Sequence, residues 1–250
     1  QFGYFNNKNK YNLKNFLGKF KNKNLIDKLF VFHEKDKKYL KYDKSKISVV
    51  GSVKNNEIVF KDLKKDKDTL LFISEYNPES KQKKSYYKKE YKLLKFINDF
   101  CISNNKKLNI ALRSNRADKK INRNEEIQFY NKFFGNNYSI SPMDSYHFAA
   151  KSEVIICISS NLGIELLARK SKVLFVLISE SKNDYYPYLP KNELFVQRSL
   201  NKDKIFMKLK KMYDLKKKLW DNLLNIKINN LKFDPGNRLL KNEIEKIIKK

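Results

Sequence analysis

Short apolar runs along this chain alternate with longer segments whose apolar residues recur at helical spacing. The runs at 70–74, 108–112, 154–158 and 173–177 each have the length of one buried strand. The segment 85–103 carries apolar residues three and four positions apart, which predicts a helix. Apolar strands that alternate with helices indicate a parallel sheet covered on both faces. We therefore predict an α/β fold with a doubly wound, Rossmann-like parallel sheet.

The same pattern predicts further elements around these strands. We expect helices at 124–134, 144–151 and 162–169, and short strands at 138–141 and 194–196. Ligands of open parallel sheets bind outside the carboxyl ends of the strands. Residues that directly follow a predicted strand are therefore the first candidates for a site.

The two ends of the chain depart from this pattern. Residues 29–33 and 47–50 are strand candidates without an evident partner helix, and the highly charged run 61–68 reads as a linker or exposed turn. From residue 203 the chain reads as helical, with one apolar face formed by Phe206, Leu209, Met212, Leu215, Leu219 and Leu223. A second helix carries Leu240, Ile244 and Ile247. We expect these helices to pack on the sheet domain.

The net charge of +28 raises the question of a nucleic-acid partner. Only six of the 55 basic residues are Arg, and the lysines are spread along the chain among Asn and Ile. Aromatic residues between lysines at 84–91 would suit stacking on single strands, but their spacing is that of a helical core. We expect no nucleic acid, and the charge favours anionic ligands or an anionic membrane surface.

Cysteine, histidine and hydropathy patterns exclude several classes of protein. Cys101 and Cys157 fall in a predicted helix and a predicted buried strand, which suits a reducing cytoplasm. His33 and His147 lie far from each other and from any cysteine cluster, so we predict no metal site and no cofactor. No apolar run approaches the roughly 18 residues that a membrane span requires.

The strongest local signal is EVIICISSNLGIELLARKSKVLFV, residues 153–176. An apolar strand runs into Ser159, Ser160 and Asn161, which begin a helix. Hydroxyl groups and the unpaired N–H groups of a first helical turn can bind an anion such as a diphosphate. The same residue types also cap helices, and the local sequence does not separate the two interpretations.

Two further residues of this segment fit a ligand site. Gly163, in the first turn, lets a ligand or a neighbouring backbone approach closely. Glu165, one turn into the helix, could accept hydrogen bonds from ribose hydroxyls. The segment lacks both the Walker loop and the GxGxxG pattern.

The longer stretch SYHFAAKSEVIICISSNLGIELLARKSKVLFV resembles the C-terminal, nucleotide-sugar-binding half of GT-B glycosyltransferases and related surface-carbohydrate biosynthesis proteins. The resemblance extends over about 51–198. It implies that the Ser-rich turn, Ser159 and Ser160, faces the donor phosphates and that Glu165 faces the donor ribose. It also implies a site between two domains.

Two other stretches fit this resemblance. FISEYNP, with Ser74, resembles the first strand and loop of such a domain, and ALRSNR, with Arg113 and Arg116, resembles the second. Arginines at a strand end can bind phosphate oxygens bidentately. The alternative is surface ion pairing with Glu125 and Glu126.

Ser145 and Tyr146 precede His147 at the start of another predicted helix, where Tyr or His could contact a base or sugar. His147 could also act as a catalytic base, but no carboxylate stands at a readable spacing, which favours a packing role. We name no catalytic residue.

The resemblance also suggests how the chain is organised. Its opening residues are similar to a loop near the end of a GT-B N-terminal domain, and the chain does not begin with Met, so we expect a truncated protein. We divide it into 1–65, a remnant of the N-terminal domain with a linker; 66–202, the nucleotide-sugar-binding domain; and 203–250, helices that pack on it.

The resemblance implies a glycosyltransferase in lipopolysaccharide or capsule biosynthesis. From the cysteines and the positive charge we expect it in the cytoplasm, in peripheral contact with an anionic membrane. Its partners would be a nucleotide-sugar donor and a glycan or glycolipid acceptor. Two alternatives stay open: a polyol-phosphate transferase or nucleotide-sugar epimerase on the same fold, and a basic nucleic-acid-binding module.

Overall fold

The computed structural model describes residues 28–39, 43–60, 64–76, 84–115, 122–135, 137–140, 144–178, 189–190, 193–228 and 231–249. The chain forms two compact units, which are described separately. The first comprises 1–59, 181–190 and 223–250, and the second comprises 60–180 and 191–222.

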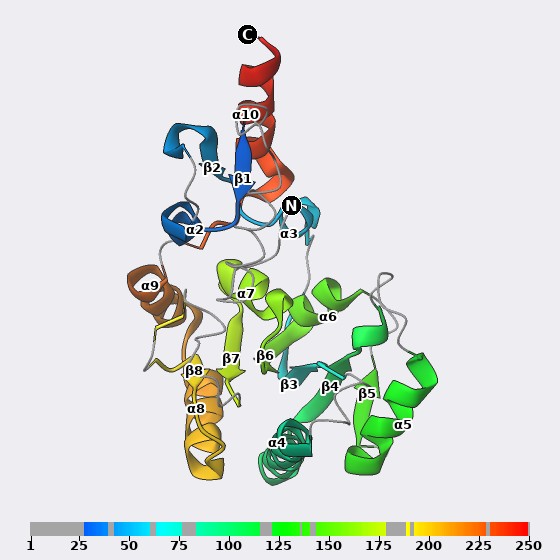
Figure 1. Cartoon of the computed structure of the whole chain (residues 1–250). Coiled ribbons are helices and arrows are strands. Elements are labelled where there is room, and N and C mark those ends of the chain that lie inside the picture. Colours follow the sequence, from blue (N-terminus) through cyan, green and yellow to red (C-terminus); the bar gives the residue numbers. More distant parts are fainter. Residues whose placement is uncertain are drawn as a thin grey trace. The chain divides into compact units, whose positions relative to one another are not determined.

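A six-stranded, wholly parallel sheet organises the second unit (Figure 1). Its strands are β3 (Asp66–Ile73), β4 (Lys107–Ala111), β5 (Tyr138–Ile140), β6 (Ser152–Cys157), β7 (Lys172–Val176) and β8 (Val196–Gln197). They lie in the order β5-β4-β3-β6-β7-β8, and each neighbouring pair is parallel. The order reverses direction between β3 and β6, as in doubly wound sheets, so the predicted fold class is confirmed.

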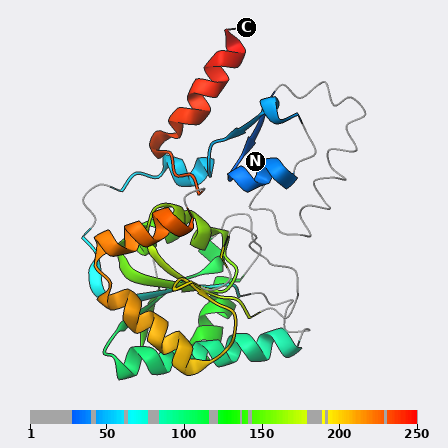
Figure 2. The same ribbon diagram turned by 90° about the vertical axis from the view of Figure 1, so that its left-hand side faces the viewer.

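Helices cover both faces of this sheet. They are α4 (Lys84–Ser103), α5 (Arg123–Phe134), α6 (Ser145–Lys151), α7 (Asn161–Ala168) and α8 (Lys202–Asp214), with a 3-10 turn, η4, at Arg113–Asn115. Helix α9 (Lys217–Lys227) begins in this unit, and its residues from Leu223 on belong to the first unit. Figures 1 and 2 show α4 and α8 on one face, and α6 and α7 on the other. The ring of Phe100 on α4 lies 5.3 Å from that of Phe206 on α8. Strands β6 and β7 and the second half of β3 are almost entirely buried, which explains their continuous apolar runs.

Two segments of the second unit differ from the prediction. Part of the predicted linker is strand, because β3 begins at Asp66, whose carboxylate lies 3.1 Å from the Lys107 ammonium on the neighbouring strand. The predicted apolar helix after residue 203 is two helices, since Leu215 has extended backbone angles between α8 and α9. The break shifts the buried face, so that Leu219 is 54% exposed while Trp220 is fully buried.

The first unit contains β1 (Leu29–Val31), α2 (Glu34–Tyr39), η2 (Lys44–Lys46), β2 (Ile47–Val49), α3 (Val53–Glu57), η5 (Pro235–Asn237) and α10 (Arg238–Ile248). The two strand candidates of the sequence pair with each other in parallel register. Helix α2, which lies between them along the chain, went unpredicted because its sequence, EKDKKY, lacks apolar periodicity.

Buried amides attach the C-terminal segment to this first unit. The side chain of Asn56 donates to the Val50 carbonyl at 2.9 Å and to Asn237 Oδ1 at 3.0 Å, and it accepts from the Asp234 N–H at 3.0 Å. The Ser48 hydroxyl donates to Glu243 of α10 at 2.7 Å. We predicted that the helices of 203–250 pack on the sheet domain; residues 203–222 are grouped with the sheet unit, and 223–250, with α10, are grouped with the first unit.

Candidate functional site

One buried carboxylate, that of Glu126 on α5, joins the carboxyl ends of β3 and β4. It accepts hydrogen bonds from the backbone N–H groups of Arg113 and Ser114, each at 2.8 Å, and from the hydroxyl of Ser74. Glu126 is fully buried, so these donors replace the water that its charge would otherwise require. A single helical residue thus fixes both strand-end loops.

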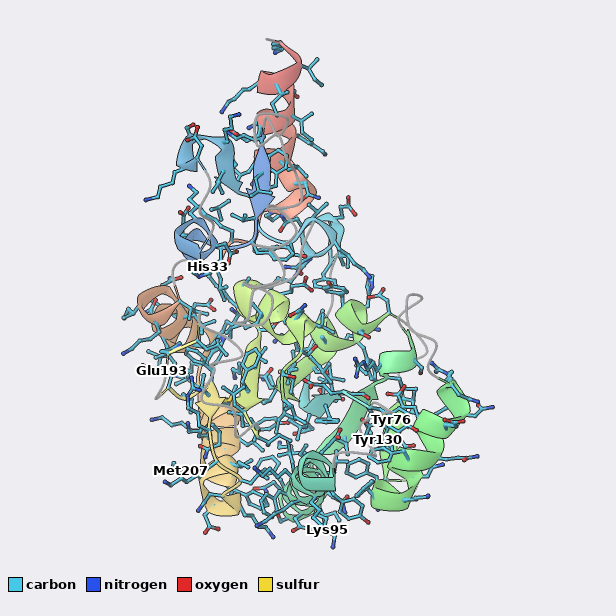
Figure 3. All side chains as sticks on the ribbon, viewed as in Figure 1. His33, Tyr76, Lys95, Tyr130, Glu193 and Met207 are labelled. Atoms are coloured by element: carbon cyan, nitrogen blue, oxygen red, sulfur yellow. The ribbon has the colours of Figure 1, made fainter. Side chains whose placement is uncertain are left out.

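Ser74, which directly follows β3, is the centre of a small network. Its hydroxyl oxygen accepts from the Tyr130 hydroxyl at 2.7 Å and from the Tyr76 backbone N–H at 3.1 Å, while the hydroxyl proton goes to Glu126. Tyr76 and Tyr130 are labelled in Figure 3. The Ser74 hydroxyl, which we predicted to contact the ligand, therefore makes three hydrogen bonds within the protein.

Glu75 links the end of β3 to the end of β6. Its carboxylate accepts hydrogen bonds from the Ser159 backbone N–H and from the Ser159 hydroxyl, the latter at 2.5 Å. β3 and β6 are neighbouring strands, so the contact lies at the point where the strand order reverses. Sequence reasoning missed Glu75, although its place directly after a strand end was a usable signal.

The side chain of Arg113 binds backbone carbonyls in this structure, whereas the sequence left open phosphate binding and ion pairing with Glu125 and Glu126. Its Nη1 donates to the backbone carbonyls of Glu75, at 3.1 Å, and Tyr76, at 3.2 Å. Glu126 binds the backbone N–H of Arg113 instead of its guanidinium. Arg116, the second predicted arginine, lies outside the described residues.

The serine turn after β6 begins helix α7. Ser160 occupies the N-cap position, but its side chain makes no capping hydrogen bond. Its backbone carbonyl accepts from the Gly163 N–H at 3.0 Å, and Asn161 is the exposed first residue of the helix. The Ser160 hydroxyl therefore does not cap helix α7, which was one of the two interpretations of the serine turn.

Gly163 serves helix packing. A Cβ atom at this position would lie 2.6 Å from the sulfur of Cys157 and 3.0 Å from the ring of Phe175. The glycine thus lets α7 lie close against β6 and β7. We expected it to admit a ligand or a neighbouring backbone; what approaches it is the side chains of the sheet.

Glu165 is buried on α7 and accepts a hydrogen bond from the hydroxyl of Tyr146 on α6. Arg169, one turn further on, lies 4.5 Å from the ring centroid of Phe60. Burial lowers the pKa of Arg169 to about 10, so its guanidinium stays charged at neutral pH. Glu165 and Tyr146, both singled out in the sequence, are therefore brought together.

His147 does have a carboxylate partner. Its Nδ1 lies 2.5 Å from Asp144 Oδ2, and the Asp144 side chain also accepts from the N–H groups of Tyr146 and His147 at the start of α6. The His147 ring lies 5.4 Å from that of Phe60. Sequence reasoning missed Asp144, three residues before His147. Ser145 is the first residue of this helix.

A further carboxyl group, that of Glu90 on α4, is buried within the electrostatic influence of Glu75 and Arg113. Glu90 is 2% exposed, and burial together with the charge of Glu75 raises its pKa to about 7, against the opposing charge of Arg113. Its Oε1 has no hydrogen-bond partner in the described part of the chain. Burial also raises the pKa of the neighbouring Tyr130 hydroxyl well above its usual value.

These residues form a strand-end cluster, which we define as Ser74, Glu75, Glu90, Arg113, Ser114, Glu126, Tyr130 and Ser159. It brings together Ser74, Arg113 and Ser159 of the predicted site. Among the residues the structure describes, no group of His, Cys, Asp and Glu side chains is arranged to hold a metal ion. The cluster contains hydroxyls, backbone N–H groups and a guanidinium, the groups that bind oxyanions. In this structure the carboxylates of Glu126 and Glu75 accept hydrogen bonds from several of these donors.

Solved structures with a similar fold identify the class of domain. MnaA of S. aureus, solved with UDP, has a TM-score of 0.57 and 15% identity, covering 89% of this chain and 61% of that chain. A UDP-N-acetylglucosamine 2-epimerase has a TM-score of 0.51 and 13% identity, covering 89% and 57%. The wall teichoic acid polymerase TagF has a TM-score of 0.53 and 12% identity, covering 97% and 61%.

These neighbours are enzymes, and their similarity shows the fold alone. The six-stranded parallel sheet is the GT-B-like domain half that they share, as the resemblance implied. This chain spans 57% to 61% of the length of those three chains.

The sequence itself matches one protein family over residues 5–248, the family described as "putative O-antigen biosynthesis protein". The chain belongs to that family, and the protein is therefore one of surface-polysaccharide biosynthesis. No curated protein matches the sequence.

Replacing Gly163 by Ala should lower the free energy of unfolding by about 1–3 kcal/mol, because the new methyl group overlaps Cys157 and Phe175. Adding Cys157→Ala removes the sulfur, so the double variant should lose less stability than the two single variants added together. Urea denaturation of all four proteins measures this. Simple additivity would show that the two positions are not in contact.

Glu90→Gln should change how stability depends on pH. Folding raises the Glu90 pKa from 4.5 to about 7, so its stabilising proton is fully present below pH 4.5 and lost as the pH rises through 7. The glutamine variant, which cannot ionise, should gain on the order of 2–3 kcal/mol relative to wild type between pH 4.5 and pH 8. Thermal unfolding across this range measures the gain, with the exposed Glu125→Gln as control. Parallel curves would contradict the shifted pKa.

Proposed function

We propose that this protein is a glycosyltransferase that moves a sugar or sugar acid from a nucleotide-activated donor to a surface-polysaccharide acceptor. The observation that carries the proposal is the serine turn between β6 and α7, at the carboxyl end of a GT-B-like sheet in a member of an O-antigen biosynthesis family. By the crevice rule for doubly wound sheets, a ligand binds at this place.

The donor phosphates would bind Ser159, Ser160 and the first N–H groups of α7, where the helix dipole favours negative charge. The bonds of Arg113 to the two carbonyls both use Nη1, so its Nε and Nη2 carry donors for a phosphate. Arg116 would add a second guanidinium. Stabilising the departing nucleotide phosphate would then be the main catalytic effect, and no base is assigned.

The donor ribose would bind near Glu165. Its carboxylate accepts a hydrogen bond from Tyr146, and a ribose hydroxyl would be a further donor to the same group. Ser145, at the start of α6, precedes Tyr146 and is the further contact that we propose here. Asn161 and Gly163 complete the turn that the donor would approach.

The same fold also supports a second activity. TagF and UDP-N-acetylglucosamine 2-epimerase match this chain about equally well, so a polyol-phosphate transferase or an epimerase would use the same nucleotide site. Product analysis separates these activities: glycan extension, transfer of a polyol phosphate, or inversion at one carbon of a free nucleotide sugar.

Glu165→Gln should weaken binding of the cognate donor about tenfold while leaving the fold intact, because the amide still accepts from Tyr146 but loses the charge that strengthens a hydroxyl contact. Calorimetric titration with UDP-, CDP- and CMP-linked sugars measures this, with Tyr146→Phe as control for the internal hydrogen bond. An unchanged affinity would remove Glu165 from the ribose site.

Tight binding to single-stranded DNA, with no nucleotide-sugar binding, would favour the nucleic-acid module.

Helix α10 suits the proposed peripheral contact with an anionic membrane on the cytoplasmic side. None of its residues is buried, and Leu239, Ile244 and Ile248 are 40%, 41% and 77% exposed. At 3.6 residues per turn, Lys241 and Lys246 border this arc on its two sides, and Glu243, which binds Ser48, lies within it. Basic residues beside an exposed apolar face are typical of helices that lie in a membrane interface. In the described part of the chain, no helix is long and apolar enough to cross a bilayer.

Ile244→Asp combined with Ile248→Asp should reduce sedimentation with phosphatidylserine-containing vesicles several-fold, because the charges oppose insertion of the apolar arc. The matched control is Asn242→Asp combined with Lys241→Asn, which also lowers the charge of α10 by two but alters only its polar face. Equal loss in both proteins would show that charge alone drives binding. Unchanged sedimentation of the isoleucine variant would exclude α10 as the contact.

A further inference from the structure

The carboxyl ends of β3 and β6 mark the topological switch point of the sheet. After β3 the chain continues through α4 to β4, and after β6 it continues through α7 to β7, so the two connections leave in opposite directions along the sheet. They also cover opposite faces (Figure 2). A crevice forms where two neighbouring connections diverge in this way, and ligands of such sheets bind there.

In this structure a side-chain carboxylate reaches across that point. Glu75, from the end of β3, accepts from both the backbone N–H and the hydroxyl of Ser159, at the end of β6. These are two of the donors that the proposed function assigns to a donor phosphate. A carboxylate and a phosphate both offer anionic oxygens to such donors, so the two groups compete for Ser159.

The strand-end cluster also contains unpartnered polar atoms. Within the described ranges, two buried side-chain atoms lack a hydrogen-bond partner, Oε1 of Glu90 and Oγ of Ser114, and both belong to the strand-end cluster. The Ser114 backbone is held by Glu126, and Glu90 lies within the electrostatic influence of Glu75 and Arg113. Buried polar atoms without partners are rare, and their concentration here indicates that the cluster is completed by a ligand.

We propose that Glu75 is an internal competitor of the anionic ligand, whose carboxylate occupies one phosphate position at Ser159 and must leave before the donor binds. This inference rests on the proposed function. The charge of Glu75 acts on Glu90 in this cluster, so a further anion that entered while Glu75 stayed in place would be repelled. Exchange of Glu75 for phosphate leaves the two donors of Ser159 satisfied.

The consequence is a reduced apparent affinity. Only molecules in which Glu75 has released Ser159 are competent to bind, and the apparent dissociation constant rises by the inverse of that fraction. Removing the charge of Glu75 should therefore strengthen binding, the opposite of what is expected for a residue that contacts the ligand favourably. The sign of the effect separates the two roles.

Glu75→Gln tests this on the full chain by calorimetric titration with UDP at low salt. The amide has the shape of the carboxylate but no charge, so we expect the UDP dissociation constant to fall about tenfold. The matched control is Glu125→Gln, an exposed residue on α5 that removes the same charge without touching Ser159. Its affinity should stay near that of wild type.

Equal or weaker binding of UDP to Glu75→Gln than to Glu125→Gln would overturn the inference and make Glu75 a structural tie or a ligand contact. If neither wild type nor variant binds UDP, CDP or CMP, the proposed function fails, and inorganic pyrophosphate then decides the role of Glu75. Pyrophosphate should shift the Ser159 amide resonance in Glu75→Gln at a lower concentration than in wild type. The same response in both proteins, or none in either, would overturn the inference independently of any nucleotide.

Discussion

The arrangement of the site depends on how the backbone N–H groups beyond the strand ends find acceptors. A parallel sheet leaves such groups unpaired where each strand stops, and burying them without partners is costly. Glu126 satisfies two of them after β4, and Glu75 satisfies one after β6. The loops that carry Ser74, Arg113 and Ser159 are held in place by these carboxylates rather than by apolar packing alone.

As a result, this strongly basic protein has buried acidic side chains at its proposed site. The chain carries a net charge of +28, yet Glu90 and Glu126 are buried in the strand-end cluster. Charge-assisted bonds to N–H and hydroxyl groups stabilise Glu126, whereas Glu90 lowers its burial cost by holding its proton to a higher pH. Overall charge and local electrostatics are thus separate properties, and only the local arrangement bears on ligand binding.

The sequence pattern predicted the sheet well because its strands are buried on both faces. Residues 154–158 and 173–177 are apolar throughout, and a run of that length has few alternatives to a central parallel strand. Prediction failed where the chain is polar or where a helix changes phase. Helix α2 has no apolar stripe. After the break at Leu215, Trp220 is buried instead of Leu219, which we had placed on the buried face.

For the proposed site, the sequence by itself determined the candidate residues Ser159, Ser160 and Glu165, because strand ends, helix starts and their polar residues are local features. The tertiary structure alone decided which distant residues meet them. It placed Glu75 on Ser159, Tyr146 on Glu165, and Cys157 with Phe175 against Gly163. Such pairings depend on strand order and on how closely each helix approaches the sheet, which periodicity along one chain does not encode.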